Sequence, residues 1–310
     1  MFRQTLKKNV RFGNHFIILF ITYLLGLKYN VPVILDINTL NKCKELGIII
    51  KNNKYSKYDS LKKYNSCLYC WESFDKIIYF QNHINNHNKN NINKDRIKFT
   101  KEIDLKDKNI IDLFNDNYII DKNILYNITG FHNNQFLQSP KIMNILIDYF
   151  NHIDNIQCKN IINHNKYSSR YNNNNDLFIH VRTGDVFNNV DIDTIYPSIH
   201  YYELILDKKH TYNIKYISSD NIDHPLCQLL IKKYHLVVYI NNEIDTILFG
   251  STCKDIIISS GTYSFLIGLL SFYSKNVYIS QEAGLDIHGI QRWHPDFYPE
   301  FLHYNKYNQL

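Results

Sequence analysis

Residues 177–187 read LFIHVRTGDVF, and this stretch decides the fold of the C-terminal half of the chain. Its first residues are almost all apolar, as in a strand buried on both faces of a parallel sheet. Three ionisable residues follow within six positions, namely His180, Arg182 and Asp185. Open α/β sheets bind their ligands at the carboxyl ends of the strands. The stretch therefore predicts a buried strand with a binding site at its end.

The sequence that follows alternates between short apolar runs and amphipathic segments. We expect strands at residues 177–182, 214–218, 236–240, 255–259 and 276–280, with helices at 198–209, 225–234, 243–253 and 262–273. Single helices between short apolar strands are typical of a parallel sheet that is covered on both faces. The pattern predicts a doubly wound, Rossmann-like domain over residues 177–285.

The N-terminal half, residues 1–162, has a weaker pattern. A helix is expected from about Asn14, a strand at 31–36, and a second helix that begins at Ser139-Pro140, a favourable N-cap and first-turn pair. We interpret this half as a second Rossmann-like domain on the acceptor side. The fold expected for the whole chain is α/β and GT-B-like, with two such domains facing a cleft. An Asn-rich linker at 163–176 and an aromatic-rich tail at 286–310 complete this division.

Composition sets broad limits on function. The 310 residues are 45% hydrophobic and 21% charged, which is enough to bury a core, and the formal net charge is +6. This mild basicity suits an anionic small ligand as well as nucleic acid. The six Cys are scattered, so reduced thiols are expected. The apolar run 16–27 is too short to span a bilayer and lacks a cleavage site, so we expect a buried helix and a cytoplasmic protein without a membrane span.

Polar clusters follow three of the expected strands. They are His180/Arg182/Asp185, then Ser218-Ser219-Asp220, then Ser259-Ser260-Gly261-Thr262. In a parallel sheet they lie on one edge, where a Ser/Thr turn opening a helix and a nearby Arg can bind phosphate. Taken singly, such Ser and Thr residues are also ordinary helix caps. Because no Gly-x-Gly-x-x-Gly and no phosphate-binding loop occur, dinucleotide redox enzymes and nucleotide hydrolases are disfavoured.

Four segments resemble the motifs of the fucosyltransferase superfamily, in the same order. FIHVRTGDVF (178–187) resembles its His-x-Arg-x-x-Asp motif, and VRFGNHFIILFITYLLGLKYNVPVILD (10–36) its opening loop, helix and strand. YISSD (216–220) is similar to the second motif, and KDIIISSGTYSFLIGLLS (254–271) to the third. A fifth segment, GFHNNQFLQS (130–139), is faintly similar to an aromatic-Gln segment that precedes the mid-chain helix. The resemblance extends over roughly residues 9–37 and 128–281.

The resemblance implies an inverting, metal-independent transferase that moves fucose from GDP-fucose to a glycan or protein hydroxyl. It implies that Arg182 binds the β-phosphate of the donor, with His180 beside it. It also implies that Asn14, with Arg11 nearby, approaches the donor from the N-terminal domain. The donor-site residues expected from motifs and strand ends together are His180, Arg182, Asp185, Asp220, Asp255, Ser259, Ser260, Gly261 and Thr262. Thr183 stands where the α1,2 and α1,6 branches carry a second Arg, so the linkage is left open. Asp36 and His15 are candidates for the base, or simply a turn residue and a loop residue.

One segment points to a different chemistry. Cys67, Cys70, His83 and His87 have the spacing C-x2-C-x12-H-x3-H within residues 65–89, which is that of a Cys2His2 zinc finger. Two free thiols and two loop histidines are the plain alternative. An Asp191-x-Asp193 pair could hold a divalent ion, but such pairs are common by chance.

The sequence therefore leaves alternatives to the transferase hypothesis. One is a zinc-finger interaction or nucleic-acid-binding protein, and nucleic acid is the less favoured partner because a lone finger reads only about three base pairs. The other is a module that binds a nucleotide sugar without turnover. The transferase hypothesis itself needs no cofactor for catalysis, with zinc as an optional structural ion.

Overall fold

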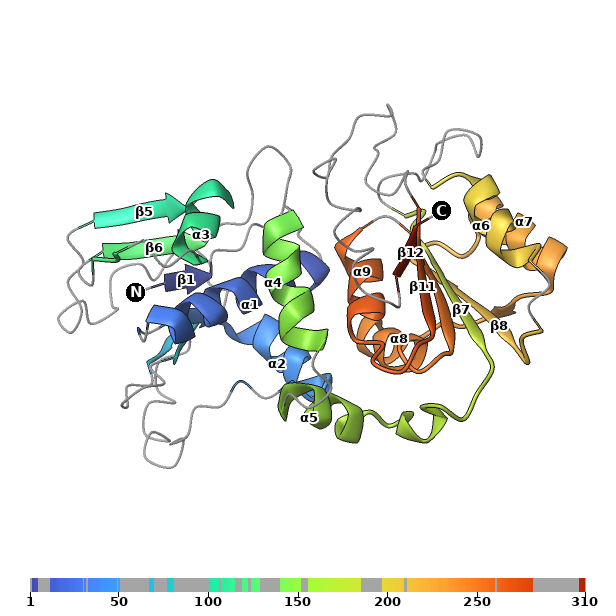
Figure 1. Cartoon of the computed structure of the whole chain (residues 1–310), viewed down its shortest axis with the longest axis horizontal. Coiled ribbons are helices and arrows are strands. Elements are labelled where there is room, and N and C mark those ends of the chain that lie inside the picture. The colour runs from blue at the N-terminus through green and yellow to red at the C-terminus, as the bar shows by residue number, and fades with distance from the viewer. Residues whose placement is uncertain are drawn as a thin grey trace. The chain divides into compact units, whose positions relative to one another are not determined.

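We describe a computed structural model of the chain. It describes residues 2–4, 12–29, 31, 33–48, 50, 67–69, 77–80, 101–105, 107–114, 119–121, 124–128, 140–151, 156–184, 197–208, 211–259, 261–280 and 307–309. The chain forms two compact units (Figure 1), of which the first is Met1–Glu45 with Ile49–Leu137 and the second is Leu46–Ile48 with Gln138–Leu310. The second unit therefore begins before the Asn-rich stretch 163–176, where the sequence predicts a linker.

Unit 1 is built around a sheet with the strand order β3-β4-β2-β1-β6-β5. The strands are β1 (Phe2–Gln4), β2 (Val33–Asp36), β3 (Cys67–Tyr69), β4 (Ile77–Phe80), β5 (Lys101–Leu105) and β6 (Ile124–Ile128). All neighbours pair in parallel except β3 and β4, which are antiparallel. Its helices are α1 (Phe12–Tyr29), α2 (Ile37–Glu45) and α3 (Asp107–Phe114). The sequence anticipates only the first helix and β2 of this unit.

Helix α1 supplies much of the core of unit 1. Phe16, Ile17, Leu19, Phe20 and Ile21 are each fully buried. A helix that is apolar nearly all round is stable in water only when neighbours cover it, and β1, β2 and α2 pack against this one. Among the described residues, α1 is long and apolar enough to cross a membrane by length and composition, but 61% of it is buried inside the protein. The expectation of a buried first helix is confirmed, but its premise of too short an apolar run is wrong, because the helix extends over Phe12–Tyr29.

Unit 2 contains the doubly wound sheet that the sequence predicts. Its strands are β7 (Leu177–Val181), β8 (Lys215–Ser219), β9 (Val237–Val238), β10 (Asp255–Ile258), β11 (Asn276–Ile279) and β12 (Tyr307–Gln309), in the order β12-β11-β10-β7-β8-β9. Every pair of neighbours is parallel. Its helices are α4 (Pro140–Asn151), α5 (Ile156–His164), α6 (Ile199–Leu206), α7 (Pro225–Tyr234), α8 (Glu243–Gly250) and α9 (Thr262–Leu269).

Helices cover both faces of this sheet, with α6 and α7 on one side and α8 and α9 on the other (Figure 1). Successive side chains of a strand point to opposite faces. Leu177, Ile179 and Val181 accordingly lie in the core cluster with α6 and α7. Phe178 contacts the ring of Phe249 in α8, with ring centroids 6.1 Å apart. His180, two residues on, faces the same α8/α9 layer.

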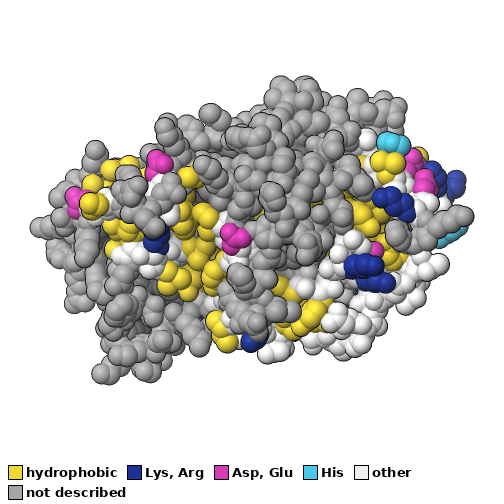
Figure 2. Space-filling model, in the orientation of Figure 1, with side chains coloured by type: hydrophobic (Ala, Val, Ile, Leu, Met, Phe, Trp, Pro, Cys, Tyr) yellow, Lys and Arg dark blue, Asp and Glu magenta, His cyan; other side chains and the backbone are white. Residues whose placement is uncertain are grey.

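The surface of unit 2 is charged over α6 and α7, where acidic and basic side chains gather in Figure 2. An exposed ion pair links these two helices, with Lys233 Nζ 2.8 Å from Glu203 Oε1. Exposed pairs of this kind contribute little to stability. The charge on this face is therefore mixed in sign rather than a basic stripe.

The Asn-rich segment before β7 is folded as part of unit 2. It ends α5, forms a short 3-10 turn at Ser168–Arg170, and meets the amino ends of β7 and β10. Asn165 Nδ2 donates to the Leu248 carbonyl at 2.8 Å, and Asn174 Nδ2 donates to the Thr252 carbonyl at 2.9 Å. The segment contains few apolar residues, and these side-chain hydrogen bonds attach it to the rest of the unit instead.

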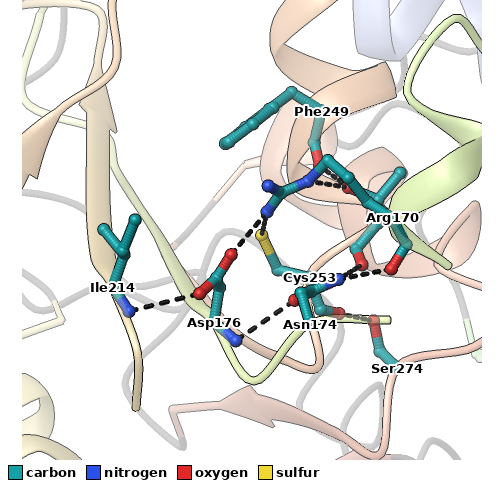
Figure 3. A network of polar contacts seen from close by, with 8 residues as sticks. Arg170, Asn174, Asp176, Ile214, Phe249, Cys253 and Ser274 are labelled. Carbon is teal, nitrogen blue, oxygen red and sulfur yellow. Dashed lines mark hydrogen bonds and ion pairs between the residues drawn. The ribbon is translucent and has the colours of Figure 1, made fainter. Parts of the chain in front are cut away.

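Arg170 is the centre of this amino-edge network (Figure 3). Its Nη2 lies 2.8 Å from Asp176 Oδ2, and its guanidinium lies 4.4 Å from the centre of the Phe249 ring. Its Nε donates to Thr252 Oγ1 at 3.0 Å. Burial raises the pKa of the neighbouring Cys253 thiol to about 12, although Arg170 acts in the opposite direction. The network joins three segments that are distant in sequence.

Candidate anion-binding site

The strand order of unit 2 contains a single reversal of direction among its described strands. Read from β9, the order is β9-β8-β7-β10-β11-β12, so the chain moves outward one way from β7 and then the other way from β10. This is the 3-2-1-4-5-6 order of Rossmann domains, in which ligands bind outside the carboxyl ends of the two strands at the reversal. The expected position of a ligand is therefore the edge formed by the ends of β7 and β10.

Arg182 and Gly261 meet at this edge. Arg182 directly follows β7, and Gly261 is the N-cap of α9 with φ of +105°. A Cβ built on Gly261 would lie 2.6 Å from Arg182 Nη1 and 3.2 Å from Arg182 Cδ. The arginine side chain thus lies across the backbone at the start of α9, a position that only glycine leaves open. The positive φ requires glycine for a second, independent reason.

The electrostatics of this contact are unusual for a purely structural arginine. The N-terminus of a helix carries a partial positive charge and favours anions. The first turn of α9 contains no acidic residue. A guanidinium placed there adds its charge to this partial charge, so an anion bound between the two is attracted by both. The arrangement is suited to bind phosphate oxygens, which accept two parallel hydrogen bonds from a guanidinium.

A chain of hydroxyl contacts lies under the arginine. His180 Nδ1 is 2.5 Å from Ser264 Oγ, and Ser264 Oγ is 3.0 Å from Ser259 Oγ. The backbone N–H of Arg182 donates to Ser259 Oγ at 3.0 Å. His180, Ser259 and Ser264 are 5%, 3% and 1% exposed. The chain joins β7, the turn after β10, and α9 within the protein interior.

Asp220 holds the turn after β7. Its Oδ1 accepts the backbone N–H groups of Thr183 and Gly184, both at 2.9 Å. A Cβ on Gly184 would lie 2.5 Å from Asp220 Oδ2, so this close approach also needs glycine. Asp220, predicted as a donor-site residue, therefore uses one carboxylate oxygen to hold the backbone beside Arg182.

Thr183 is fully buried at the end of β7. Its Oγ1 lies 2.9 Å from Ser219 Oγ and donates to the Asn221 carbonyl at 3.0 Å. The thiol of Cys227 lies 3.8 Å away, and burial raises its pKa. Thr183 thus connects the end of β7 to the end of β8 through its hydroxyl.

Asp255 lies at the opposite edge of the sheet from the anion site. It is the first residue of β10, whereas Ser259 follows the last, so about 13 Å of strand separates them. Its carboxylate accepts the Tyr212 hydroxyl at 2.7 Å and the Asn276 amide at 2.8 Å. The structure therefore does not bring Asp255 to the other predicted donor-site residues, because a strand separates its two ends.

Of the remaining predicted residues of unit 2, one lies at the edge with Arg182 and two lie outside the described residues. Thr262 opens α9 and is 4% exposed, so it lies at the edge with Arg182. Asp185 and Ser260 lie outside the described residues. The structure thus brings together His180, Arg182, Asp220, Ser259, Gly261 and Thr262.

In unit 1, the predicted residues lie near the carboxyl ends of β1 and β2. Asn14 is partly exposed in the first turn of α1, and Arg11 lies outside the described residues. Asp36 ends β2 and is 2% exposed. Its Oδ2 accepts the backbone N–H and the hydroxyl of Thr39, both at 2.7 Å, which makes Asp36 the cap of α2. Gln4 connects the region, since it accepts the Asp36 N–H and donates to the His15 carbonyl.

The predicted zinc ligands fall almost entirely outside the described residues. Cys67 opens β3, while Cys70, His83 and His87 lie outside the described part, as do Asp191 and Asp193. Within the described residues, no group of three or more His, Cys, Asp or Glu side chains is placed to hold a metal ion. The zinc-finger hypothesis stays a prediction.

Sequence reasoning misses two contributors to the arrangement of unit 2. Ser264 falls inside an expected helix with no role of its own, although it contacts both His180 and Ser259. Arg170 falls inside the expected linker. The only signal for Ser264 is its polarity beside a segment that is otherwise apolar, FLIGLL.

Fold and site together define the class of protein: an α/β chain whose second unit is a Rossmann-like domain with a cationic edge at the β7/β10 reversal. No protein-family model and no curated protein matches the chain. Among solved structures, it is similar to the crystal structure of the selenomethionine form of fucosyltransferase NodZ from Bradyrhizobium, with a TM-score of 0.45 and 10% identity. The match covers 89% of this chain and 93% of that chain.

Proposed function

We propose that the chain is a glycosyltransferase that uses a nucleotide-diphosphate sugar, with GDP-fucose as the donor. The observation that carries the proposal is the Arg182 guanidinium lying across Gly261 at the start of α9. It is supported by the four sequence motifs in fucosyltransferase order, two of which supply this arginine and this glycine. We further propose that the two units correspond to the halves of a GT-B enzyme, with unit 1 on the acceptor side.

The chemistry follows from the charge that develops in the reaction. The acceptor hydroxyl attacks the anomeric carbon and forms a new C–O bond, while the bond from that carbon to the diphosphate oxygen breaks. Negative charge grows on the leaving GDP as this bond lengthens. Arg182 and the N–H groups of α9 are placed to stabilise this charge without reorganising, and such preorganised stabilisation accounts for much of the rate enhancement of many enzymes. A single displacement of this kind inverts the anomeric carbon, and in our proposal the positive charge of Arg182 and α9 takes the place of a metal ion at the diphosphate.

The acceptor proton must pass to a base in the same step. Asp36 and His15 are the candidates in unit 1, with Asn14 and Arg11 approaching the donor from that side. Asp36 is the weaker candidate on structural grounds, since one of its oxygens already caps α2. The acceptor hydroxyl belongs to a glycan or a protein.

Ligand-induced thermal stabilisation tests the proposal. Wild type and Arg182→Ala are heated with GDP, GDP-fucose, UDP or CMP, and Arg182→Lys serves as the matched control that keeps the charge but loses the planar fork. A ligand at 100 times its Kd raises the free energy of unfolding by about 2.7 kcal/mol. In proteins of roughly 150–250 residues, each kcal/mol raises the Tm by about 2–4 °C. We expect a shift of several degrees in wild type with the two guanosine diphosphates only, a smaller one in Arg182→Lys, and none in Arg182→Ala.

Two outcomes would contradict the proposal. One is the absence of stabilisation of wild type by any of the four nucleotides. The other is equal stabilisation of Arg182→Ala and wild type, which would place the ligand elsewhere. GDP release from GDP-fucose then separates an enzyme from a binding module, and the same release in EDTA separates it from a metal-dependent transferase.

A further inference from the structure

We propose that Ser264 is a positioning residue of the anion site, whose hydroxyl fixes the backbone of Arg182 relative to the N-terminus of α9. The inference rests on the proposed function of that site and goes beyond it, because no sequence motif assigns a role to Ser264. Ser264 is the third residue of α9 and is 1% exposed, so it does not contact the ligand itself.

Ser264 connects the elements that make up the site. Its Oγ lies 2.5 Å from His180 Nδ1 on β7 and 3.0 Å from Ser259 Oγ in the turn after β10. Ser259 Oγ in turn accepts the Arg182 N–H at 3.0 Å. One hydroxyl on α9 is thereby linked to the residue that precedes Val181 and to the backbone of Arg182.

Some other buried hydroxyls of unit 2 donate to a nearby carbonyl. Ser251, Thr252 and Ser271 each donate to the carbonyl three residues earlier, in Leu248, Phe249 and Gly268. Such local bonds satisfy a hydroxyl at a helix end and need no distant partner. The contacts of Ser264 with His180 and Ser259 reach other segments, one of them 84 residues away. Its hydroxyl therefore connects β7, the turn after β10 and α9, a long-range link of the kind that Thr252 Oγ1 makes with Arg170 at the amino edge.

The consequence for the site is geometric. The Arg182 side chain passes 3.2 Å or less from the ideal Cβ position of Gly261, so a small shift of α9 along β7 changes the distance from the guanidinium to the helix N-terminus. Charge stabilisation at a binding site depends on holding such groups within about 0.5 Å. A displacement of about 1 Å can lower activity by on the order of 100-fold. Through its contacts with His180 and Ser259, the Ser264 hydroxyl is placed to oppose that displacement.

The test uses full-length Ser264→Ala, with Ser271→Ala as the matched control. Ser271 lies just past the other end of α9, is fully buried, and donates its hydroxyl to the nearby Gly268 carbonyl. Inorganic pyrophosphate and GDP are titrated calorimetrically into each protein, and the Tm of each free protein is recorded. We expect Ser264→Ala to bind both ligands about tenfold or more weakly, because α9 can then shift relative to Arg182. Ser271→Ala should bind like wild type even if its Tm falls as far.

A conservative variant separates positioning from simple packing. Ser264→Thr keeps the hydroxyl, so its affinity should lie nearer to wild type than that of Ser264→Ala, although the added methyl lowers the Tm of the free protein. If Ser264→Ala does not fold, Ser264→Thr takes its place in the test. The role is refuted if Ser264→Thr folds and keeps the hydroxyl but binds about tenfold more weakly than wild type.

Failure of this inference differs from failure of the proposed function. If wild type binds both ligands and Ser264→Ala binds them equally well, the positioning role is wrong and the proposed function stands. If Ser264→Ala and Ser271→Ala weaken binding to the same extent, the effect is general packing, and the inference is again wrong. If wild type binds neither ligand, the proposed function fails, and the role of Ser264 fails with it.

Discussion

Two arginines at opposite edges of one sheet show how the same side chain can serve structure or binding. Arg170 lies at the amino edge, against a carboxylate, a hydroxyl, a thiol and the face of Phe249 (Figure 3). Arg182 lies at the carboxyl edge, across a glycine that opens a helix with no acid in its first turn. The surroundings of Arg170 include a carboxylate, whereas Arg182 lies beside the positive end of a helix dipole.

The difference teaches where to look for a site in such a domain. Parallel strands place their amino ends together on one edge and their carboxyl ends on the other. Loops at the amino edge can therefore stabilise the fold while loops at the carboxyl edge bind a ligand. At the amino edge, the Arg170 network fastens the segment before β7 to Thr252 and Cys253. At the carboxyl edge, the charge is held in place by Ser259 and Asp220 through the backbone around Arg182.

The largest effect that follows from this comparison is on folding stability. Arg170→Ala leaves the Asp176 side chain, which is 6% exposed, without its ion-pair partner. Loss of one partner of a buried pair costs about 3–5 kcal/mol, and because Arg170 is itself 23% exposed we expect a value near the lower end. Urea denaturation followed by circular dichroism measures the change.

Arg182→Ala is the matched comparison in the same experiment. Because the guanidinium opposes the partial charge of α9, we expect its removal to leave the free energy of unfolding within about 1 kcal/mol of wild type. The comparison fails if both arginines prove equally important for folding, or if Arg170→Ala unfolds at the same urea concentration as wild type.

A smaller effect is expected at Gly261. Gly261→Ala places a Cβ 2.6 Å from Arg182 Nη1 and imposes φ of +105° on an alanine. Backbone of this kind costs about 1–3 kcal/mol for a residue other than glycine. We expect a stability loss in that range together with loss of GDP binding, measured by denaturation and by calorimetry.

The double variant Gly261→Ala with Arg182→Ala separates the two causes. Removing the guanidinium relieves the contact but leaves the backbone conformation unfavourable, so stability should recover only in part. Full recovery would mean that the glycine is there only to make room for the arginine. No recovery would mean that backbone conformation alone requires it.

The sequence predicts the central strands of unit 2 well because β7 and β10 are buried along their whole length. Such strands read as continuous apolar runs, and the helix at Pro225–Tyr234 begins and ends where its pattern indicates. Unit 1 gives fewer signals. Its strand Lys101–Leu105 reads KEIDL, which has charges in place of an apolar run, and β1 is only three residues long. Hydrophobic periodicity does not distinguish such short strands from loops.

The site is predictable where it depends on strand ends and hidden where it depends on distant contacts. Arg182 and Gly261 follow strands closely, so counting along the sequence finds them. The bond from Ser264 to His180 spans 84 residues and leaves no local pattern. The same holds for Asn165 and Asn174, whose amides reach carbonyls 83 and 78 residues on, in a segment whose composition indicates a loop.

The smallest effect is expected for substitution of Asp36 in unit 1. This substitution tests whether Asp36 is only the N-cap of α2 or is also the general base. Its Oδ2 caps α2, while its Oδ1 is buried without a hydrogen-bond partner in the described part of the chain. Asn is as good an N-cap as Asp, whereas Ala costs typically about 1 kcal/mol. We expect Asp36→Asn to match wild type in urea denaturation and in GDP release with a glycan acceptor, and Asp36→Ala to lose about 1 kcal/mol of stability. If Asp36→Asn instead folds normally yet loses turnover by on the order of 100-fold or more, the carboxylate acts as the general base, since proton transfer contributes about that much.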